Sequence, residues 1–206
     1  MKNTTDEPDV AALLAVLSAG PEAMDGLHRR LEEAATREGI LDVAYTTVDT
    51  PVGSLLLAAT EKGLVRVAFA SEGHDQVLGV LASKLSPRIL RAPRRLDEAA
   101  REIDQYFARS RTNFDLRLDL SLSSGFRLLV QRHLPDIAYG RTESYAQVAR
   151  FVGSPQAVRA VGSACAANPL PVVVPCHRVL RSDGSLGGYV GGLATKAALL
   201  TMEAAT

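Results

Sequence analysis

Cysteine and tryptophan are scarce in this chain. Its 206 residues include two cysteines and no tryptophan. The two cysteines, Cys165 and Cys176, lie close together and none precedes them, which argues against a disulfide-stapled secreted fold and against zinc-finger spacing. We therefore expect free thiols, a reducing compartment such as the cytoplasm, and no metal site.

A long apolar run is also missing. The apolar stretch at residues 10–17 is much shorter than the roughly 20 residues of a membrane-spanning helix, and acidic residues rather than basic ones precede it. We expect neither a signal peptide nor a membrane anchor. A chain of this length with 47% hydrophobic residues can build one large or two small domains around an ordinary core.

Net charge is absent as well, because 23 Lys+Arg balance 23 Asp+Glu. The balance conceals an asymmetry: residues 123–206 hold 8 basic and 4 acidic residues, and the rest holds 15 and 19. The C-terminal part is therefore positive and the front part negative. A moderately basic half is typical of a protein that contacts phosphates, although many proteins that bind no nucleic acid share it.

The front part changes from a helical to a strand pattern. Residues 1–41 are predicted as a helical extension with helices at 10–19 and 22–38, and this extension is a candidate partner surface. Residues 42–122 are predicted as an N-terminal α+β domain. Its expected elements are an antiparallel meander at 43–48, 55–59 and 64–69, helices at 75–85 and 96–109, and a strand at 114–120.

The C-terminal part, residues 123–206, is expected to be mostly helical. Helices are predicted at 125–134, 144–152 and 155–167, followed by a short strand at 172–174 and a last helix that starts at Leu193. The turn Gly153-Ser154 between two of these helices indicates a helix-turn-helix, but ordinary helical hairpins use such turns too.

The segment Val-Pro-Cys-His-Arg-Val at 174–179 is the strongest chemical signal. A thiolate is a strong nucleophile, and a nearby histidine or arginine increases its population. Neighbouring side chains on an extended strand point to opposite faces, so His177 can serve Cys176 only if the chain turns there or a water bridges them. A free cysteine is often mere packing, which is our interpretation of Cys165.

Further blocks surround this segment in a fixed order. They are SYAQVA at 144–149, AVRAVG at 157–162, Asn-Pro at 168–169, GYVGG at 188–192, and LLTME at 199–203 with Lys196 before it. In order and spacing the chain closely resembles the O6-alkylguanine-DNA alkyltransferases, also called methylated-DNA–protein-cysteine methyltransferases. The resemblance implies an α+β fold: a ribonuclease-H-like α/β domain in front and a mostly helical C-terminal domain with a DNA-binding helix-turn-helix.

The resemblance also implies a single-turnover repair reaction. After the damaged nucleotide is flipped out of the duplex, Cys176 would take the alkyl group from O6-alkylguanine, with O4-alkylthymine as a further candidate. His177 would accept the thiol proton through a water, and Glu203 would orient His177. The thioether would be permanent, and no cofactor or obligate protein partner would be required.

Roles toward DNA follow from the same resemblance. Tyr145 would crowd the 3′ phosphate and touch the guanine edge. Arg159, on a helix in the minor groove, would take the place of the extruded nucleotide in the base stack of double-stranded DNA. Asn168 would connect the helix-turn-helix to the site, although Asn-Pro is equally a common turn former.

Roles toward the flipped base complete the expected site. Tyr189 and the backbone N–H of Val190 would donate to the guanine edge, while the backbone carbonyls of Cys176 and Val179 would accept from its exocyclic amine. Lys196 would help to hold the binding loop.

The chain departs from the family pattern at the start of the C-terminal part. Arg127 stands where a glutamine is common, Gln131 stands where a tryptophan is common, and Pro135 lies three residues before the usual position. These changes leave DNA affinity and substrate range open. The main alternative is a non-repairing protein that binds alkylated bases and flags them for another pathway. A cysteine hydrolase or redox sensor is a more remote one.

Overall fold

The computed structural model describes residues 21–204, so the helix predicted at 10–19 lies outside the described residues. The chain divides into two compact units, one ending at Leu41 and the other beginning at Asp42. In the first unit, helix α2 (Pro21–Arg37) matches the helix predicted at 22–38.

The second unit begins with a four-stranded sheet. Its strands are β1 (Val43–Thr50), β2 (Gly53–Thr60), β3 (Gly63–Phe69) and β4 (Ile89–Arg91), in the spatial order β3-β2-β1-β4. The first three strands form the predicted antiparallel meander, while β4 pairs in parallel with β1. Strand β4 was not predicted, because three residues are too few to show a period.

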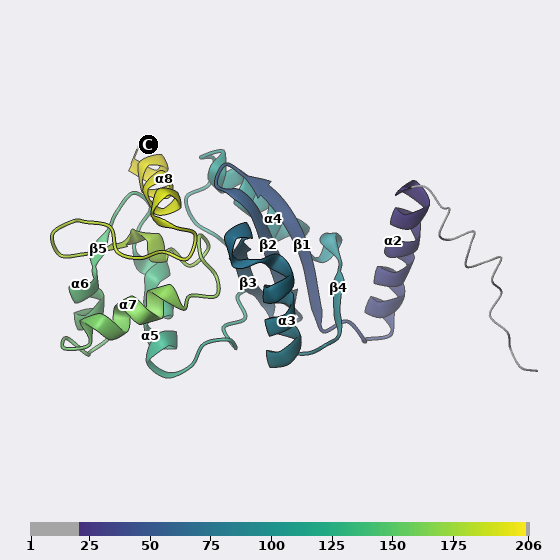
Figure 1. Cartoon of the computed structure of the whole chain (residues 1–206), viewed down its shortest axis with the longest axis horizontal. Coiled ribbons are helices and arrows are strands. Elements are labelled where there is room, and N and C mark those ends of the chain that lie inside the picture. Colours follow the sequence, from purple (N-terminus) through teal and green to yellow (C-terminus); the bar gives the residue numbers. More distant parts are fainter. Residues whose placement is uncertain (1–20, 205–206) are drawn as a thin grey trace, which may run out of the picture. The chain divides into compact units, whose positions relative to one another are not determined.

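Helices cover both faces of this sheet (Figure 1). Helix α3 (His74–Lys84) packs through Val77 and Leu81 on the face that includes Val43 and Leu56. Because side chains alternate along a strand, Leu57 belongs to the opposite face, where it is also fully buried. Helix α4 (Asp97–Phe107) contacts β1 and lies behind the sheet in Figure 1. This confirms the α+β fold expected for the front part.

The outer edge of the sheet, β3, is covered by segments from elsewhere in the chain. Leu64 exchanges backbone hydrogen bonds with Arg117 and Asp119, each 2.8 Å long, and the N–H of Val67 donates to the carbonyl of Pro169 at 2.9 Å. The strand predicted at 114–120 is wrong, since it reduces to one isolated bridge between Leu64 and Leu118. The Asp119 side chain accepts from Thr60 and from the N–H of Ser121, which turns the chain away from the sheet.

The C-terminal half is mostly helical, as expected. Its helices are α5 (Gly125–His133), α6 (Tyr145–Phe151), α7 (Val158–Ala166) and α8 (Leu193–Ala204), with a two-residue parallel ladder of β5 (Glu143–Ser144) and β6 (Val179–Leu180). Ser144 caps α6 by accepting from the N–H of Gln147, whose side chain accepts from the N–H of Ser144 in return. Short 3-10 turns lie at Ala70–Glu72, Pro93–Leu96 and Leu134–Asp136.

The strand predicted at 172–174 is also wrong. Residues 171–174 form a turn, in which Val172 has a φ of 74° and the N–H of Val174 donates to Leu170 at 2.7 Å. The apolar run reflects burial rather than extension, because Val172 is fully buried.

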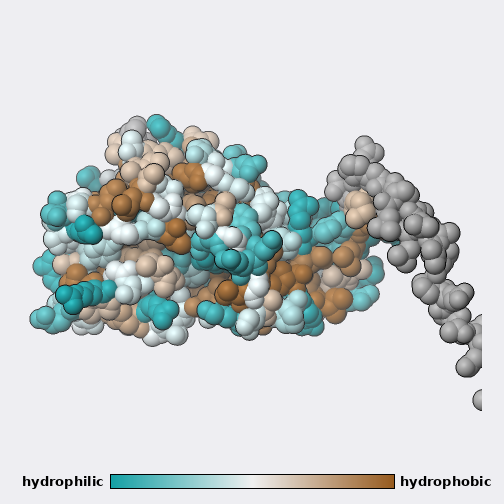
Figure 2. Space-filling view, viewed as in Figure 1, coloured by the Kyte–Doolittle hydropathy of each residue, from teal (hydrophilic) through white to brown (hydrophobic). Residues whose placement is uncertain are grey.

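Hydrophilic and hydrophobic residues interleave over the face of the molecule shown in Figure 2. Within residues 21–204, no helix has the length and apolar character needed to cross a membrane.

Candidate active site

Cys176 opens a single 3-10 turn, Cys176–Arg178, immediately after the buried turn at 171–174. The N–H of Cys176 donates to Val174 at 2.8 Å, and the N–H of Arg178 donates to Pro175 at 3.0 Å. The chain therefore turns at Cys176, which is one of the two conditions under which His177 was expected to serve the thiol. The Cys176 side chain is only 2% exposed.

Asn168 contacts the thiol of Cys176 and the turn that precedes it. Its Nδ2 donates to Cys176 Sγ at 3.2 Å and to the carbonyl of Val174 at 2.7 Å, while its Oδ1 accepts from the N–H of Leu170 at 3.0 Å. Asn168 thus supports the turn through Leu170 and Val174 and also contacts the thiol, a contact that was not predicted from the sequence.

His177 and Glu203 form a buried pair. His177 Nε2 lies 2.9 Å from Glu203 Oε1, and both side chains are almost fully buried. The other ring nitrogen, Nδ1, is buried and has no hydrogen-bond partner. Among residues 21–204, Sγ of Cys176 and the imidazole of His177 share no direct hydrogen bond.

Glu203 accepts from several further donors. Arg178 Nε donates to Oε2 at 2.9 Å and Arg178 Nη2 to Oε1 at 3.0 Å, while the N–H of Gly140 donates to Oε2 at 3.2 Å. The hydroxyl of Tyr106, on α4, donates to Oε1 at 2.6 Å. Glu203 is therefore a buried structural hub and not the solvated side chain that a position near the end of the chain would suggest.

Burial dominates the protonation of the site. It raises the pKa of the Cys176 thiol to about 11, although the hydrogen bond from Asn168 and the charge of Lys196 pull the other way. Burial also lowers the pKa of His177, against the attraction of Glu203. For Glu203, burial alone would raise the pKa, but hydrogen bonds from His177 and Arg178 outweigh it and bring the pKa down to about 2. The resting site thus holds a neutral thiol, a neutral imidazole and an ionised carboxylate.

This charge pattern corrects one expectation from the sequence. Arg178 was expected to favour the thiolate of Cys176, but its guanidinium pairs with Glu203 and donates to the carbonyl of Ile137 at 2.6 Å. The cation that favours the thiolate is Lys196, which is fully buried.

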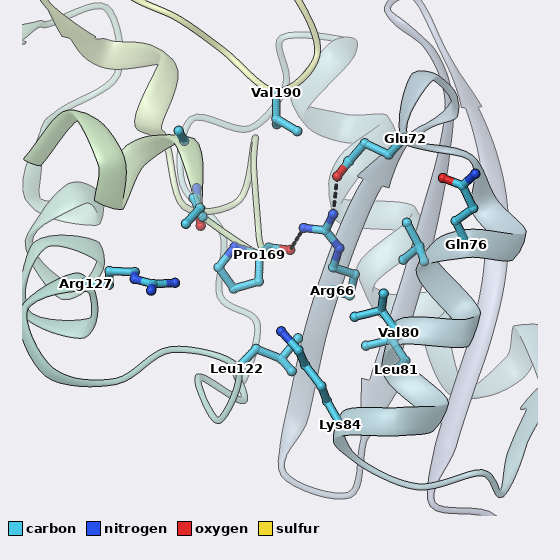
Figure 3. Close-up of a pocket in the computed structure, with 14 residues that line it drawn as sticks. Arg66, Glu72, Gln76, Val80, Leu81, Lys84, Leu122, Arg127, Pro169 and Val190 are labelled. Atoms are coloured by element: carbon cyan, nitrogen blue, oxygen red, sulfur yellow. Dashed lines mark hydrogen bonds and ion pairs between the residues drawn. The ribbon is translucent and has the colours of Figure 1, made fainter. Parts of the chain in front are cut away.

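The other predicted base-binding residues lie around this turn. Lys196 Nζ donates to the carbonyl of Val179 at 2.6 Å and lies 5.9 Å from the centre of the Tyr145 ring. The Tyr189 ring packs edge-on against His177, with centroids 6.3 Å apart. Val190 lies further along the same loop and lines a neighbouring cavity together with Pro169 and Arg66 (Figure 3).

The predicted helix-turn-helix is present as α6 and α7, which pack on each other and on α5. Arg159 is exposed near the start of α7, while Val161, Ala164 and Cys165 face inward. Cys165 is 5% exposed, in agreement with a packing role.

A cavity of about 380 Å³ adjoins the site on the side of the sheet (Figure 3). Asn168 and Pro169 form part of its wall, and Arg66 bridges Glu72 and the carbonyl of Pro169. Cys176 is not among the residues that line it. In the described part of the chain, no three His, Cys, Asp or Glu side chains gather closely enough to hold a metal ion.

Comparison with known proteins connects this geometry to a family. Residues 43–120 match the family described as 6-O-methylguanine DNA methyltransferase, ribonuclease-like domain, and residues 125–205 match its DNA binding domain. The chain belongs to the methylated-DNA–protein-cysteine methyltransferases.

Individual relatives agree with this assignment. The methylated-DNA–protein-cysteine methyltransferase of Mycolicibacterium paratuberculosis is 38% identical over 78% of this chain and 92% of its own length. That of Methanosarcina barkeri is 36% identical over 77% and 96%. The crystal structure of Mycobacterium tuberculosis O6-methylguanine methyltransferase superposes with a TM-score of 0.70 at 36% identity, over 79% of this chain and 93% of that one. A further crystal structure, of Mycobacterium tuberculosis OGT in complex with DNA, gives the same TM-score of 0.70.

Two features of the site were not predicted from the sequence. Tyr106 lies 97 residues before its partner Glu203, and nothing in the sequence marks it beyond its place on the apolar side of a predicted helix. Arg178 was noted, but its partner was not. An arginine inside an otherwise apolar, buried run signals a buried carboxylate partner, and that signal was available.

Gln131, which stands where the family commonly has a tryptophan, makes specific buried hydrogen bonds. Gln131 is 1% exposed, and its Nε2 donates to the carbonyls of Ala164 and Ala167 at 3.2 and 3.5 Å. Carbonyls in the last turn of a helix have no partner within the helix, so Gln131 caps α7 from α5.

Proposed function

We propose that this chain repairs alkylated DNA directly, by irreversible transfer of the alkyl group from O6-alkylguanine to Cys176, with O4-alkylthymine as a further candidate substrate. The observation that supports this most strongly is the buried thiol held by Asn168 beside the His177–Glu203 pair. A protein that only flagged lesions would need no nucleophile, so this geometry disfavours the alternative.

The reaction begins with extrusion of the nucleotide, because an O6 substituent cannot be reached inside a duplex. The exposed Arg159 at the start of α7 is free of the protein core and would occupy the gap in the base stack from the minor groove. Tyr145, the first residue of α6, would press on the 3′ phosphate. DNA is thus the proposed partner, and no obligate protein partner is proposed.

The chemical step needs a base, because the resting thiol of Cys176 is protonated. The unoccupied Nδ1 of His177 would accept the thiol proton through a bridging water, while Glu203 holds the proton on Nε2. Sγ then bonds to the alkyl carbon as the carbon–O6 bond breaks, and the electron pair of that bond stays on the guanine.

Hydrogen bonds to the leaving guanine would stabilise that charge. The Tyr189 hydroxyl and the N–H of Val190 are the proposed donors. The carbonyls of Cys176 and Val179 would accept from the exocyclic amine. Lys196 occupies one lone pair of the Val179 carbonyl and leaves the second for the base.

The product would be a thioether, which is chemically stable, so we propose that each molecule acts once and without a cofactor. Such a thiol requires reducing surroundings, which supports the cytoplasm as the proposed location.

We also propose the domain division 1–41, 42–122 and 123–206. The two family matches, which end at residue 120 and resume at 125, support its second boundary.

Intact mass and peptide mapping test the function. One equivalent of an O6-methylguanine duplex should add one methyl group, located on the Cys176 peptide. Cys176→Ala should abolish the addition, while Cys165→Ala, which removes the other thiol, should retain it. An unmodified wild-type protein that still binds the duplex would favour the lesion-flagging alternative.

A further inference from the structure

One side chain from the front half of the chain contacts the His177–Glu203 pair. Tyr106 lies on α4, is fully buried, and its hydroxyl donates to Glu203 Oε1 at 2.6 Å. The same hydroxyl lies 3.5 Å from His177 Nε2, too far for a normal hydrogen bond. The direction of donation is fixed, because burial, together with Glu203, raises the pKa of Tyr106 and keeps its proton in place.

The contact has a geometric consequence for His177. Oε1 of Glu203 receives Tyr106 on one side and His177 on the other, while Arg178 spans both carboxylate oxygens. With Glu203 fixed as acceptor, the Nε2 of His177 must be the protonated nitrogen. The free lone pair is then on Nδ1, the nitrogen without a partner.

We propose that Tyr106 is a positioning residue for alkyl transfer: its hydroxyl orients Glu203 and thereby holds His177 in the tautomer whose Nδ1 accepts the thiol proton. This inference rests on the proposed function. It makes the N-terminal half part of the reaction, although Tyr106 itself touches neither the thiol nor the proposed substrate position.

The surroundings of His177 determine the expected pH dependence. The groups that face it are Glu203 and Lys196 from α8, Tyr106 from α4, the neighbouring Arg178, and the Tyr189 ring from the loop. Removing the Tyr106 hydroxyl takes one donor away from Glu203. The carboxylate then attracts the protonated imidazole more strongly, so His177 should stay protonated, and inactive as a base, to higher pH.

The test compares two tyrosine-to-phenylalanine variants. Tyr106→Phe keeps the ring that packs against Phe114 and Tyr139. Tyr139→Phe is the matched control, since it removes a buried hydroxyl without a partner from the same aromatic cluster. Single-turnover methyl transfer is measured from pH 5 to 9. We expect Tyr106→Phe to lower the rate at neutral pH about tenfold, a fraction of what a general base contributes, and to shift the acidic limb of the profile upward. Tyr139→Phe should do neither.

Equal rates and equal profiles for the two variants would overturn the role of Tyr106 while leaving the proposed function intact. A wild-type protein that transfers no methyl group would overturn both. If Tyr106→Phe does not fold, nitrogen NMR of the His177 imidazole in the wild-type protein decides, because a proton found on Nδ1 at neutral pH contradicts the inference.

Discussion

The Cys176 thiol is neutral at rest, and this shapes its reactivity. Its pKa of about 11 means that only a small fraction is thiolate at neutral pH. A thiol is a weak nucleophile until it loses its proton, so Cys176 should react only slowly with simple alkylating agents. If His177 takes the thiol proton as proposed, deprotonation would be useful only when an alkylated base is in place, and this would confine the single use of the protein to its substrate.

Asn168 offers a direct test of this balance. Its N–H to Sγ stabilises the thiolate, and hydrogen bonds to charged groups contribute about 1.5–3 kcal/mol. We expect Asn168→Ala to raise the pKa of Cys176 further and to slow methyl transfer by about 10- to 100-fold, measured by single-turnover kinetics. The exposed Asn113→Ala serves as control, and an unchanged rate in Asn168→Ala would refute the role.

The buried carboxylate of Glu203 should make the stability of the folded state depend on pH in the acidic range. Its pKa of about 2 lies below the ordinary 4.5, so its ionised form stabilises the folded state. That stabilisation is complete above pH 4.5 and is lost as the pH falls toward 2. Glu203→Gln should therefore be less stable than the wild type at pH 7, and its urea midpoint should change less between pH 5 and 3. The exposed Glu61→Gln should follow the wild-type curve.

For single side chains, the sequence predicted what local motifs encode. Cys176, His177, Glu203 and Asn168 do lie together, but their roles in transfer stay predictions. Tyr106 was beyond reach, because a contact across 97 residues depends on how the two halves dock. The raised pKa of Cys176 was likewise unpredictable, since burial, and not the adjacent arginine, decides it.

Among the elements, the loop before α8 depends on close approach by two of its glycines. A Cβ at Gly187 would overlap the Tyr145 hydroxyl, and a Cβ at Gly191 would lie 2.8 Å from the Phe69 ring on β3. Phe69 also packs edge-on against Tyr189, with centroids 5.7 Å apart. The glycines therefore allow the loop to press against both halves, a role the sequence alone did not specify.

A pair of glycine substitutions tests this. Gly191→Ala must push Phe69 aside, so we expect a loss of about 1–3 kcal/mol in the free energy of unfolding, as for other overpacked sites. Gly188→Ala is the matched control three residues away, where a Cβ meets nothing within 4 Å. Urea unfolding of both variants measures the difference, and similar midpoints would show that the loop yields easily.

Element prediction succeeded where periodicity was sustained and failed where pairing was brief. The meander and helices α3 to α8 follow from their apolar patterns. The segment 114–120 alternates like a strand, yet Asp119 binds Thr60 and Ser121 and leaves a single bridge. The apolar run at 172–174 is buried just before Cys176, and an apolar character alone does not distinguish a buried strand from a buried turn.

For the whole molecule, charge sets how DNA is held. The C-terminal part has an excess of four positive charges, 8 basic against 4 acidic. Each phosphate contact contributes about −0.9 to the slope of log binding constant against log salt. We expect a shallow slope, of magnitude below about 4, in fluorescence titrations with an unmodified duplex between 50 and 200 mM salt. A slope near −10 would contradict binding by this part alone.

The cover over β3 has a consequence for solubility. An uncovered edge strand can recruit a strand from another molecule, and here Arg117, Asp119 and Pro169 occupy that edge. Pro169 follows Asn168, which contacts the Cys176 thiol, so one short segment both supports the thiol and covers the edge of the sheet. A change that loosens residues 168–169 would therefore leave the N–H of Val67 without its partner and open that part of the β3 edge to pairing with another molecule.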